Sequence, residues 1–336
     1  MKREQVAKAI KEHPNAVAVL VNNPTYYGIC SDLRAIVRMA HDAGMLCLAD
    51  EAHGTHFYFG GDMPLTAMEA GADMAAVSMH KTGGSLTQSS LLIMKRGRVR
   101  PDYVRTVINL TQTTSASYLL MSSLDIARKA LATEGRETFA RVVSLAEYAR
   151  GEINRIGGYY AFSREIIDGK YIYDFDTTKL SVNTLKIGLA GVEVYDLLRD
   201  DYGIQIEFGD MGNMLAIISV GDNHYAIERL VASLSEIKRL HGREGIKLLD
   251  HEYIPPVVRM TPQEAFYAPS SPLSIRETVG KISAEFVMCY PPGIPILAPG
   301  EEVTREALDY ILYAKEKGSL VMGPQDMELN YLYTVK

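Results

Sequence analysis

Short hydrophobic runs alternate with amphipathic segments along the first hundred residues of the chain. The runs 16–21, 45–49 and 74–77 are each of strand length and hydrophobic at every position. Such runs are typical of strands buried on both faces, as in parallel sheets. Between the first two runs, residues 32–43 carry hydrophobic side chains at helical spacing, and Gly44 ends the helix. The pattern therefore predicts a βαβ unit and a parallel sheet.

Two more helices and one more strand extend this unit. Residues 3–13 and 65–71 have hydrophobic positions at helical spacing, and Pro14 and Gly71 stop them. The hydrophobic run within 89–94 is expected to return as an antiparallel strand of the same sheet. The first half of the chain therefore has an α/β pattern.

The second half divides into helices and then mixed elements. A polar segment at 112–118 opens a long helix, and a second helix spans about 136–155. Pro255 and Pro256 mark a later boundary. The strands expected between these points are 180–184, 204–208 and 215–220, and the helices are 191–201 and 223–241. We expect a large domain over 1–150, a small α+β domain over 151–250 and a C-terminal α+β domain over 251–336.

Composition narrows the class of protein. Of the 336 residues, 47% are hydrophobic and 23% are charged, as in soluble globular domains. The net charge of −6 argues against a nucleic-acid partner, which usually meets a basic surface. No hydrophobic run approaches the ~20 residues of a membrane span. Three cysteines fit a reducing compartment, so we expect a cytoplasmic protein without disulfides or a membrane contact.

The candidate chemistry centres on Lys81, which follows the run 74–77 and precedes Gly83 and Gly84. A lysine in this place lies at the carboxyl end of a buried strand, where open α/β sheets bind their ligands. Partial loss of hydration favours the neutral amine, and a neutral amine condenses with aldehydes. Considered by position alone, a surface lysine in a polar loop is the alternative.

Asp50 ends the run 45–49 in the same way that Lys81 follows its own run. A carboxylate and an amine at the ends of two neighbouring parallel strands suit pyridoxal 5'-phosphate. The amine binds the aldehyde of the cofactor, and the carboxylate keeps the pyridine nitrogen protonated so that the ring accepts electrons. The pair therefore makes pyridoxal phosphate the expected cofactor.

Segment 78–90, SMHKTGGSLTQSS, resembles the pyridoxal-phosphate attachment signature of the bacterial ornithine/lysine/arginine decarboxylases. The resemblance extends over essentially the whole chain and implies the aspartate-aminotransferase fold. It implies a mainly parallel, incomplete sheet of the pyridoxal-phosphate-dependent transferase fold, followed by the small and C-terminal domains. The implied activity is decarboxylation of arginine, lysine or ornithine to an amine of polyamine biosynthesis.

The resemblance also implies roles for individual residues. Ser78 and His80 are implied to contact the phosphate and the lysine region, although hydrogen bonding within the loop is the alternative. Ala52 and His53 are implied to lie against the ring or its 3-hydroxyl. The residues that the resemblance assigns to the cofactor are Lys81, Asp50, Ala52, His53, Ser78, His80 and Thr113, of which Lys81, Asp50 and His80 are implied to be catalytic.

Thr113 belongs to a Thr-Thr-Ser segment that the family is implied to place on the cofactor phosphate of a partner subunit. By chemistry alone, this polar segment is also a simple helix cap. Ala116 stands where the family often has proline. A homo-oligomer, a dimer or higher, is therefore expected.

The resemblance begins partway into the large domain of the family. Residues 1–15 contain neither the phosphate-cradling Gly/Ser/Thr turn nor the ring-stacking residue that the family carries upstream. Three interpretations follow. A separate chain supplies the missing N-terminal part, or the chain is a truncated, inactive relative that acts as a structural or assembly subunit. In the third, it is an aminotransferase-fold enzyme of another specificity.

Other motifs are weaker. Residues 50–53 read Asp-Glu-Ala-His, as in a helicase class, but no GxxxxGK[ST] phosphate loop precedes them. A zinc site from His53, His56 and His80 matches no usual ligand spacing, so we expect no metal. Glu285 and Glu301 lie in the segment that resembles the C-terminal domain of the decarboxylases. Either could meet the distal cation of a basic amino acid, or lie solvated on the surface.

Overall fold

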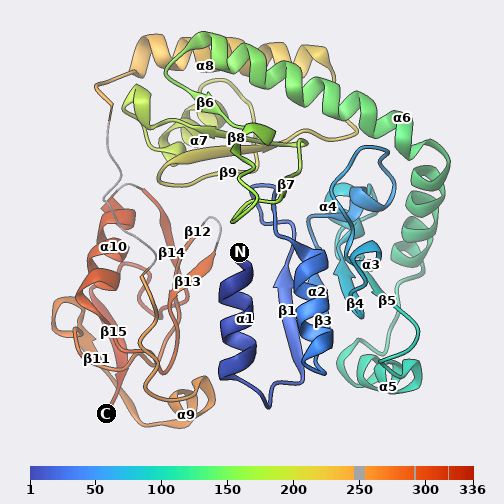
Figure 1. Ribbon diagram of the computed structural model, residues 1–336. Coiled ribbons are helices and arrows are strands. Elements are labelled where there is room, and N and C mark those ends of the chain that lie inside the picture. The colour runs from blue at the N-terminus through green and yellow to red at the C-terminus, as the bar shows by residue number, and fades with distance from the viewer. Residues whose placement is uncertain (246–253, 291–292, 317) are drawn as a thin grey trace. The chain divides into compact units, whose positions relative to one another are not determined.

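A computed structural model of the chain describes residues 1–245, 254–290, 293–316 and 318–336 (Figure 1). The described residues fall into two units. Unit 1 comprises Met1–Glu152, Phe162–Leu180 and Ile217–Glu228, and unit 2 comprises Ile153–Ala161, Ser181–Ala216 and Arg229–Lys336.

Unit 1 is built on a four-stranded sheet in the order β1-β3-β4-β5. The strands are β1 (Ala18–Asn22), β3 (Leu46–Asp50), β4 (Met74–Val77) and β5 (Leu91–Met94). The first three are parallel and β5 is antiparallel, as the hydrophobic runs predict. In the β3–β4 pair, Asp50 lies opposite Ala76. The two strands that precede the candidate aspartate and lysine are therefore direct neighbours.

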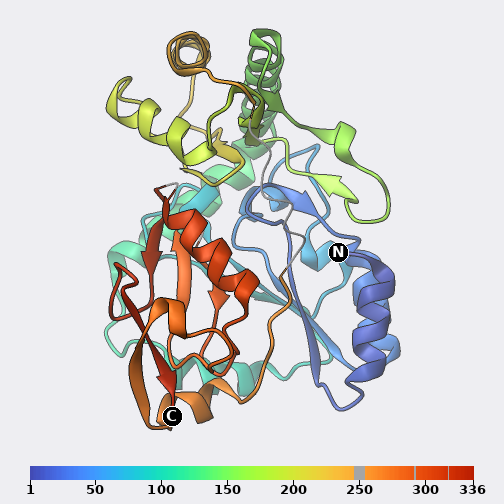
Figure 2. The ribbon, with the colours of Figure 1, turned by 90° about the vertical axis from the view of Figure 1, so that its left-hand side faces the viewer.

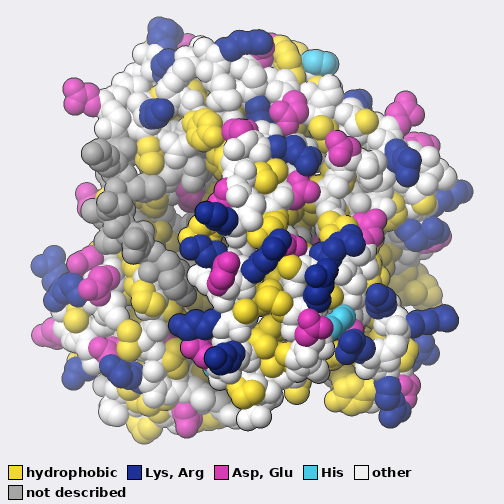
Figure 3. Space-filling model, viewed as in Figure 1, with side chains coloured by type: hydrophobic (Ala, Val, Ile, Leu, Met, Phe, Trp, Pro, Cys, Tyr) yellow, Lys and Arg dark blue, Asp and Glu magenta, His cyan; other side chains and the backbone are white. Residues whose placement is uncertain are grey.

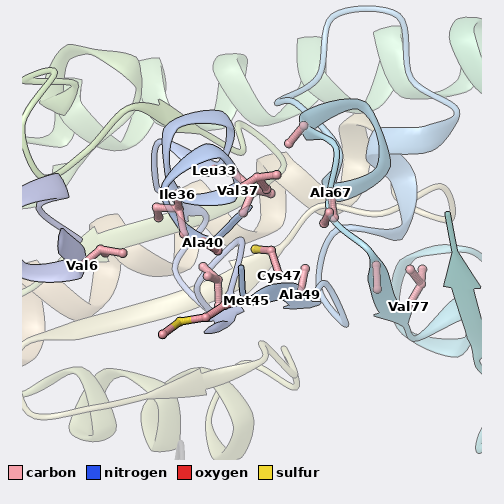
Figure 4. Close-up of a cluster of buried hydrophobic side chains, with 14 residues drawn as sticks. Val6, Leu33, Ile36, Val37, Ala40, Met45, Cys47, Ala49, Ala67 and Val77 are labelled. Carbon is pink, nitrogen blue, oxygen red and sulfur yellow. The ribbon is translucent and has the colours of Figure 1, made fainter. Parts of the chain in front are cut away.

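Three helices pack against the sheet of unit 1, and their buried side chains form one hydrophobic core with those of the strands. They are α1 (Arg3–Glu12), α2 (Leu33–Asp42) and α3 (Ala67–Ala70). The α2 helix begins where predicted, because the Asp32 carboxylate accepts the Ala35 N–H. Its buried face contacts the β3 side chains Cys47 and Ala49 in the cluster that Figure 4 shows. Burying these hydrophobic side chains supplies the main stabilisation of the sheet.

The helices after β5 differ from the prediction. A one-turn helix, α4 (Met79–Thr82), follows β4, and α5 (Pro101–Thr111) occupies a segment for which no element was expected. The two helices expected between 118 and 155 form one 39-residue helix, α6 (Tyr118–Ile156). Gly135 does not interrupt α6, and it lies close to Phe59, whose Cβ would be 2.9 Å from a Cβ placed at Gly135.

A second sheet has the order β6-β8-β10-β9, and most of its residues belong to unit 2. Its strands are β6 (Tyr160–Ala161), β8 (Lys179–Asn183), β10 (Asn213–Ile217) and β9 (Phe208–Gly209), and the helices of this region are α7 (Gly191–Asp200) and α8 (His224–His241). The strand expected over 204–208 is shorter than predicted. The Ile204 N–H donates to Leu198 O, so this segment closes the end of α7 instead.

The last part of unit 2 holds a three-stranded sheet, β13-β12-β14, and a β11-β15 pair. In Figure 2, α10 lies along the first of these sheets. The elements are α9 (Pro262–Tyr267), β11 (Ser270–Ser274), β12 (Val287–Tyr290), β13 (Ile294–Leu297), α10 (Arg305–Glu316), β14 (Leu320–Met322) and β15 (Tyr331–Val335). In unit 1, two short strands, β2 (Ile29–Cys30) and β7 (Asp174–Phe175), also pair. The predicted proline boundary follows residues 246–253, which lie outside the described residues.

Candidate functional site

Asp50 is the last residue of β3, so its carboxylate lies at the carboxyl end of the parallel sheet. Its Oδ1 accepts the N–H of Ala52 at 3.1 Å. This bond fixes the turn that follows the strand. The turn carries His53, whose side chain is buried with 7% of its surface exposed.

Lys81 lies in α4, one turn beyond the end of β4. Its Nζ is 3.0 Å from His53 Nε2. The pKa of His53 is lowered to about 3 by burial and by the positive charges of Lys179 and Lys81. The ring is therefore neutral near pH 7, and Nε2 accepts a hydrogen bond from the ammonium of Lys81.

The other ring nitrogen of His53, Nδ1, is buried and has no hydrogen-bond partner among the described residues. Because Nε2 accepts from Lys81, a neutral ring carries its hydrogen on Nδ1. A buried donor without an acceptor costs about 1–3 kcal/mol. Such a donor is suited to an acceptor oxygen of a bound group, so the residues present fit pyridoxal phosphate.

Ser78 and His80 hold α4 and the loop after it. The backbone oxygen of Ser78 accepts the Lys81 N–H at 3.1 Å. His80 Nδ1 lies 2.8 Å from the carbonyl oxygen of Ser89, and the His80 N–H donates to the same oxygen at 3.2 Å. The imidazole that contacts the Lys81 amine in this structure is therefore His53, and the predicted contacts of Ser78 and His80 with a phosphate stay predictions.

Thr113 lies in an exposed segment between α5 and α6. Its Oγ1 accepts the Ser115 N–H at 3.2 Å, a bond within the loop, while the Ser117 hydroxyl accepts the Leu120 N–H at the start of α6. Its implied ligand is the phosphate of a partner subunit. That role stays a prediction for a single chain.

Sequence reasoning missed several buried polar residues beside Lys81. Asp176 and Lys179 have no exposed surface, and Thr178 between them is also buried. His56 was considered only as a zinc ligand, yet it lies 3.0 Å from Asp176. The available signal was a pair of charged residues three positions apart, the second of which is the first residue of β8, because such charges are rarely buried unless they are paired.

The two C-terminal glutamates bind backbone groups of unit 2. Glu285 accepts the N–H of Gln325 at 2.9 Å with one carboxylate oxygen and that of Tyr333 at 2.8 Å with the other. Glu301 Oε2 accepts the Ala298 N–H at 2.9 Å. Both side chains therefore stabilise the C-terminal fold.

Two negative findings concern the described residues alone. Among them, no three His, Cys, Asp or Glu side chains come together in a way that could hold a metal ion. No helix in the described part of the chain is both long and apolar enough to span a membrane.

The fold of the chain resembles those of known decarboxylases and aminotransferases. Over its whole length the chain superposes on the Francisella novicida lysine decarboxylase with a TM-score of 0.79 at 19% identity, covering 60% of that chain. It superposes on the alanine–glyoxylate aminotransferase of Nostoc sp. with a TM-score of 0.54 at 17% identity, covering 70% of this chain and 64% of that one. The chain has the α/β fold that the sequence predicts, with structural neighbours among decarboxylases and aminotransferases.

Sequence comparison then gives the family. Residues 1–226 match the Orn/Lys/Arg decarboxylase major domain, and residues 248–324 match the C-terminal domain of the same family. The arginine decarboxylase of Bacillus subtilis (strain 168) is 44% identical over 99% of this chain and 69% of its own length. The constitutive lysine decarboxylase of Escherichia coli (strain K12) is 23% identical over 70% of this chain and 44% of its own. The chain belongs to the Orn/Lys/Arg decarboxylase family, which confirms the predicted resemblance.

The chain is shorter than these relatives. It spans about 60% of the solved lysine decarboxylases and 69% of the Bacillus subtilis arginine decarboxylase.

Proposed function

We propose that this chain supplies the lysine-bearing part of a pyridoxal-phosphate-dependent decarboxylase site whose substrate is arginine. The observation that carries the proposal is the 3.0 Å contact between Lys81 Nζ and His53 Nε2. It lies at the carboxyl end of the sheet, where Asp50 ends β3, the strand next to β4. The choice of arginine is supported by three relatives named arginine decarboxylase, at 44%, 44% and 40% identity.

The residues that would hold the cofactor are Lys81, Asp50 and His53. When bound, pyridoxal phosphate supplies a ring that takes up the electron pair left by departing carbon dioxide. Asp50 would place its carboxylate at the ring nitrogen and hold the proton there. Lys81 would bind the aldehyde carbon, and the buried Nδ1–H of His53 would donate to an oxygen of the cofactor. Ala52, Ser78, His80 and Thr113 remain proposed contacts.

We further propose that a separately supplied polypeptide completes the site. The supporting observation is the open edge of β1, where Leu20 is 70% exposed. The N–H of Leu46 donates to Val17 O and that of Asn23 to Asp50 O, so the odd-numbered residues of β1 face β3. The peptide groups of Ala18 and Leu20 therefore point to the open edge, where another strand can pair with them.

A hydrophobic hollow of about 360 Å³ adjoins this edge. It is lined by Val6, Ile10, Val19 and Leu20, among others, and Figure 3 shows hydrophobic side chains at the surface in this region. Parallel sheets are normally covered on both faces. The hollow and the edge therefore suit a polypeptide that adds to the sheet.

A homo-oligomer is proposed on a different surface. The α5 helix buries none of its residues, and Leu110 on it is 80% exposed. Tyr118 and Leu119 at the start of α6 are also exposed. Hydrophobic side chains gathered on two successive helices suit a contact between subunits.

The three cysteines are free and buried, which supports the cytoplasmic location that we propose.

Absorbance tests the function. The chain is mixed with pyridoxal phosphate, alone and together with the part of the Bacillus subtilis relative that lies outside the match. We expect a visible band of lysine-bound cofactor and release of carbon dioxide from arginine in the mixture, and neither in Lys81→Ala. Lys129→Ala, at an exposed lysine on α6, is the control.

A band that persists in Lys81→Ala would overturn the assignment of the lysine. A Lys81-dependent band without carbon dioxide release, in every mixture, would favour the alternative of a structural or assembly subunit. Faster release from lysine or ornithine than from arginine would refute the substrate.

A further inference from the structure

His56 and Asp176 form a fully buried pair beside the helix that carries Lys81. Neither side chain has exposed surface, and His56 Nε2 lies 3.0 Å from Asp176 Oδ2. The other ring nitrogen, Nδ1, lies 3.1 Å from Thr82 Oγ1. Because Thr82 directly follows Lys81, the pair is joined to the residue next to the reactive lysine.

Asp176 is held in its ionised form. Burial by itself would raise the pKa of Asp176, but the charges of His56 and Lys179 and the hydrogen bond of Thr178 together lower it. An ionised carboxylate only accepts hydrogen bonds, so His56 Nε2 carries a hydrogen. The Thr82 hydroxyl can both donate and accept, so it can bond to Nδ1 whether or not that nitrogen carries a hydrogen.

The segment that contains Asp176 is itself fixed. Asp176 Oδ1 accepts the backbone N–H of Thr178 at 3.0 Å and the hydroxyl of Thr178 at 2.7 Å. These two bonds leave the carboxylate little freedom to rotate. Asp176 Oδ2 has no hydrogen-bond partner among the described residues, and His56 Nε2 lies 3.3 Å from Thr178 Oγ1. His56 is therefore held beside the carboxylate by the charge of Asp176 and by the fixed Thr178 hydroxyl.

A second contact holds the other end of α4. His56 belongs to a one-turn 3-10 helix, Thr55–Tyr58, and the Thr55 hydroxyl of the same turn donates to Ser78 O at 2.9 Å. A Cβ at Gly83 would lie 2.9 Å from the Thr55 side chain, so the two turns pack closely. Bonds from one short turn thus reach the residue before α4 and the last residue of α4, with Lys81 between them.

Stability alone does not account for the pair. Taking two polar or charged groups out of water is costly, and well-packed hydrophobic residues of similar volume often stabilise a fold as well or better. A polar pair fixes direction and distance in a way that hydrophobic packing does not.

We propose that His56 and Asp176 are positioning residues for Lys81, which hold α4 against the Thr55–Tyr58 turn and thereby keep Lys81 Nζ at His53. The importance of that position rests on the proposed function. The rigidity of α4 does not, so the two ideas can fail separately.

Four variants test the proposal. Asp176→Asn removes the negative charge, and Thr82→Val removes the hydroxyl while keeping the shape of the side chain. Thr82→Ser restores the hydroxyl and serves as the rescue. Asp73→Asn makes the same chemical change in the His41–Asp73 pair of unit 1, whose His41 Nε2 and Asp73 Oδ2 lie 2.9 Å apart at the opposite end of the sheet.

Two measurements are made on the full chain. Hydrogen–deuterium exchange of the Lys81–Gly83 amides, without cofactor, reports the rigidity of α4. Pyridoxal phosphate followed by borohydride, with mass spectrometry, reports the rate of trapping at Lys81 relative to Lys129. We expect exchange to rise and relative trapping at Lys81 to fall about tenfold in Asp176→Asn and Thr82→Val, as for loss of one hydrogen bond to a charged or buried partner. Thr82→Ser and Asp73→Asn should match the wild type.

Unchanged exchange in Thr82→Val would overturn the proposal, and this variant decides the matter if Asp176→Asn does not fold. Equal effects of Asp73→Asn and Asp176→Asn on trapping would also overturn it, since both would then reflect general loss of stability. Wild-type protein that traps no cofactor at Lys81 would refute the proposed function, while the exchange measurement still decides whether the pair holds α4.

Discussion

The two ends of the unit 1 sheet each carry a His–Asp pair, and the pairs differ in what surrounds them. At the amino end, His41 Nε2 lies 2.9 Å from Asp73 Oδ2, and the histidine side chain is 21% exposed. At the carboxyl end, His56 lies 3.0 Å from Asp176 with neither side chain exposed. The interatomic distances are almost equal, so distance does not distinguish them.

The neighbours distinguish them. Asp73 Oδ2 also accepts the backbone N–H of Cys47 at 2.8 Å, which joins the start of β4 to β3. His56 instead reaches Thr82, beside Lys81. One pair therefore holds strands together, and the other contacts the residue next to the lysine proposed to bind the cofactor. The comparison indicates that what a His–Asp pair contacts depends on the end of the sheet at which it lies, and the carboxyl end is where such sheets bind ligands.

The largest expected effect is at the carboxyl end. Asp50→Asn keeps an oxygen that can accept the Ala52 N–H and removes the charge from the proposed ring nitrogen site. Turnover of arginine by the active assembly should fall about 10²-fold or more, as when a preorganised electrostatic partner is removed. The melting temperature should change little. Unchanged turnover would refute the role of Asp50.

Glu51, next to Asp50, shows that a residue at the carboxyl end of the sheet can also have a purely structural role. Its carboxylate binds the Tyr58 hydroxyl and a backbone N–H. The side chain is fully buried, accepts the Tyr58 hydroxyl at 2.6 Å and accepts the Ala67 N–H at 2.9 Å. Burial raises the pKa of Glu51 from its usual 4.5 to about 7. An acid whose pKa is raised by folding is ionised more easily in the unfolded chain. Its contribution to stability is therefore complete below pH 4.5 and is lost as the pH rises through about 7.

Glu51→Gln should remove this pH dependence. At about 1.4 kcal/mol per pH unit, the wild type loses up to ~3 kcal/mol across the window relative to the variant. Urea unfolding of both proteins at pH 5 and pH 8 measures the difference, and the other titrating groups cancel in the comparison. A constant difference between the two proteins at both pH values would contradict the assignment.

The hydrophobic pattern predicted the sheet well, because the hydrophobic runs of its strands and the helical spacing of the segment between them are local features of the sequence. The runs before Asp50 and Lys81 correspond to β3 and β4, and α2 lies within the segment 32–43 that was predicted as a helix. The single long α6 was not predicted, because a glycine within a helical pattern lowers helix propensity, while contacts between residues far apart in the sequence, such as that of Phe59 with Gly135, cannot be seen locally.

The candidate site was predictable only in part, for the same reason. Lys81 and Asp50 follow hydrophobic runs. Their place at the carboxyl end of the sheet could therefore be inferred from the order of the predicted strands along the chain. Three histidines lie close to Lys81 along the chain or in the fold, namely His53, His56 and His80. The local sequence does not indicate which of their side chains contacts the Lys81 amine, and the structure shows that it is His53. Asp176 lies 120 positions beyond His56 along the chain, so only the folded chain brings the two together.

At the amino end, Asp73→Ala should destabilise the protein without touching the site. The substitution leaves the buried Cys47 N–H without its acceptor, and such a loss costs about 1–3 kcal/mol. Urea unfolding measures the cost, and binding of pyridoxal phosphate to the folded protein should be unchanged. Loss of cofactor binding at full folding would show that the two ends of the sheet are coupled.

The smallest effect is expected for the partner of Asp73. His41→Ala removes one of the two hydrogen bonds to the carboxylate and leaves the Cys47 N–H bonded to it. Because the imidazole is partly exposed, water can replace it, and the loss of stability should stay below about 1 kcal/mol. Urea unfolding of His41→Ala beside Asp73→Ala tests this order. If His41→Ala costs as much as Asp73→Ala, the histidine and not the backbone bond stabilises the amino end, and the two His–Asp pairs are more alike than their surroundings indicate.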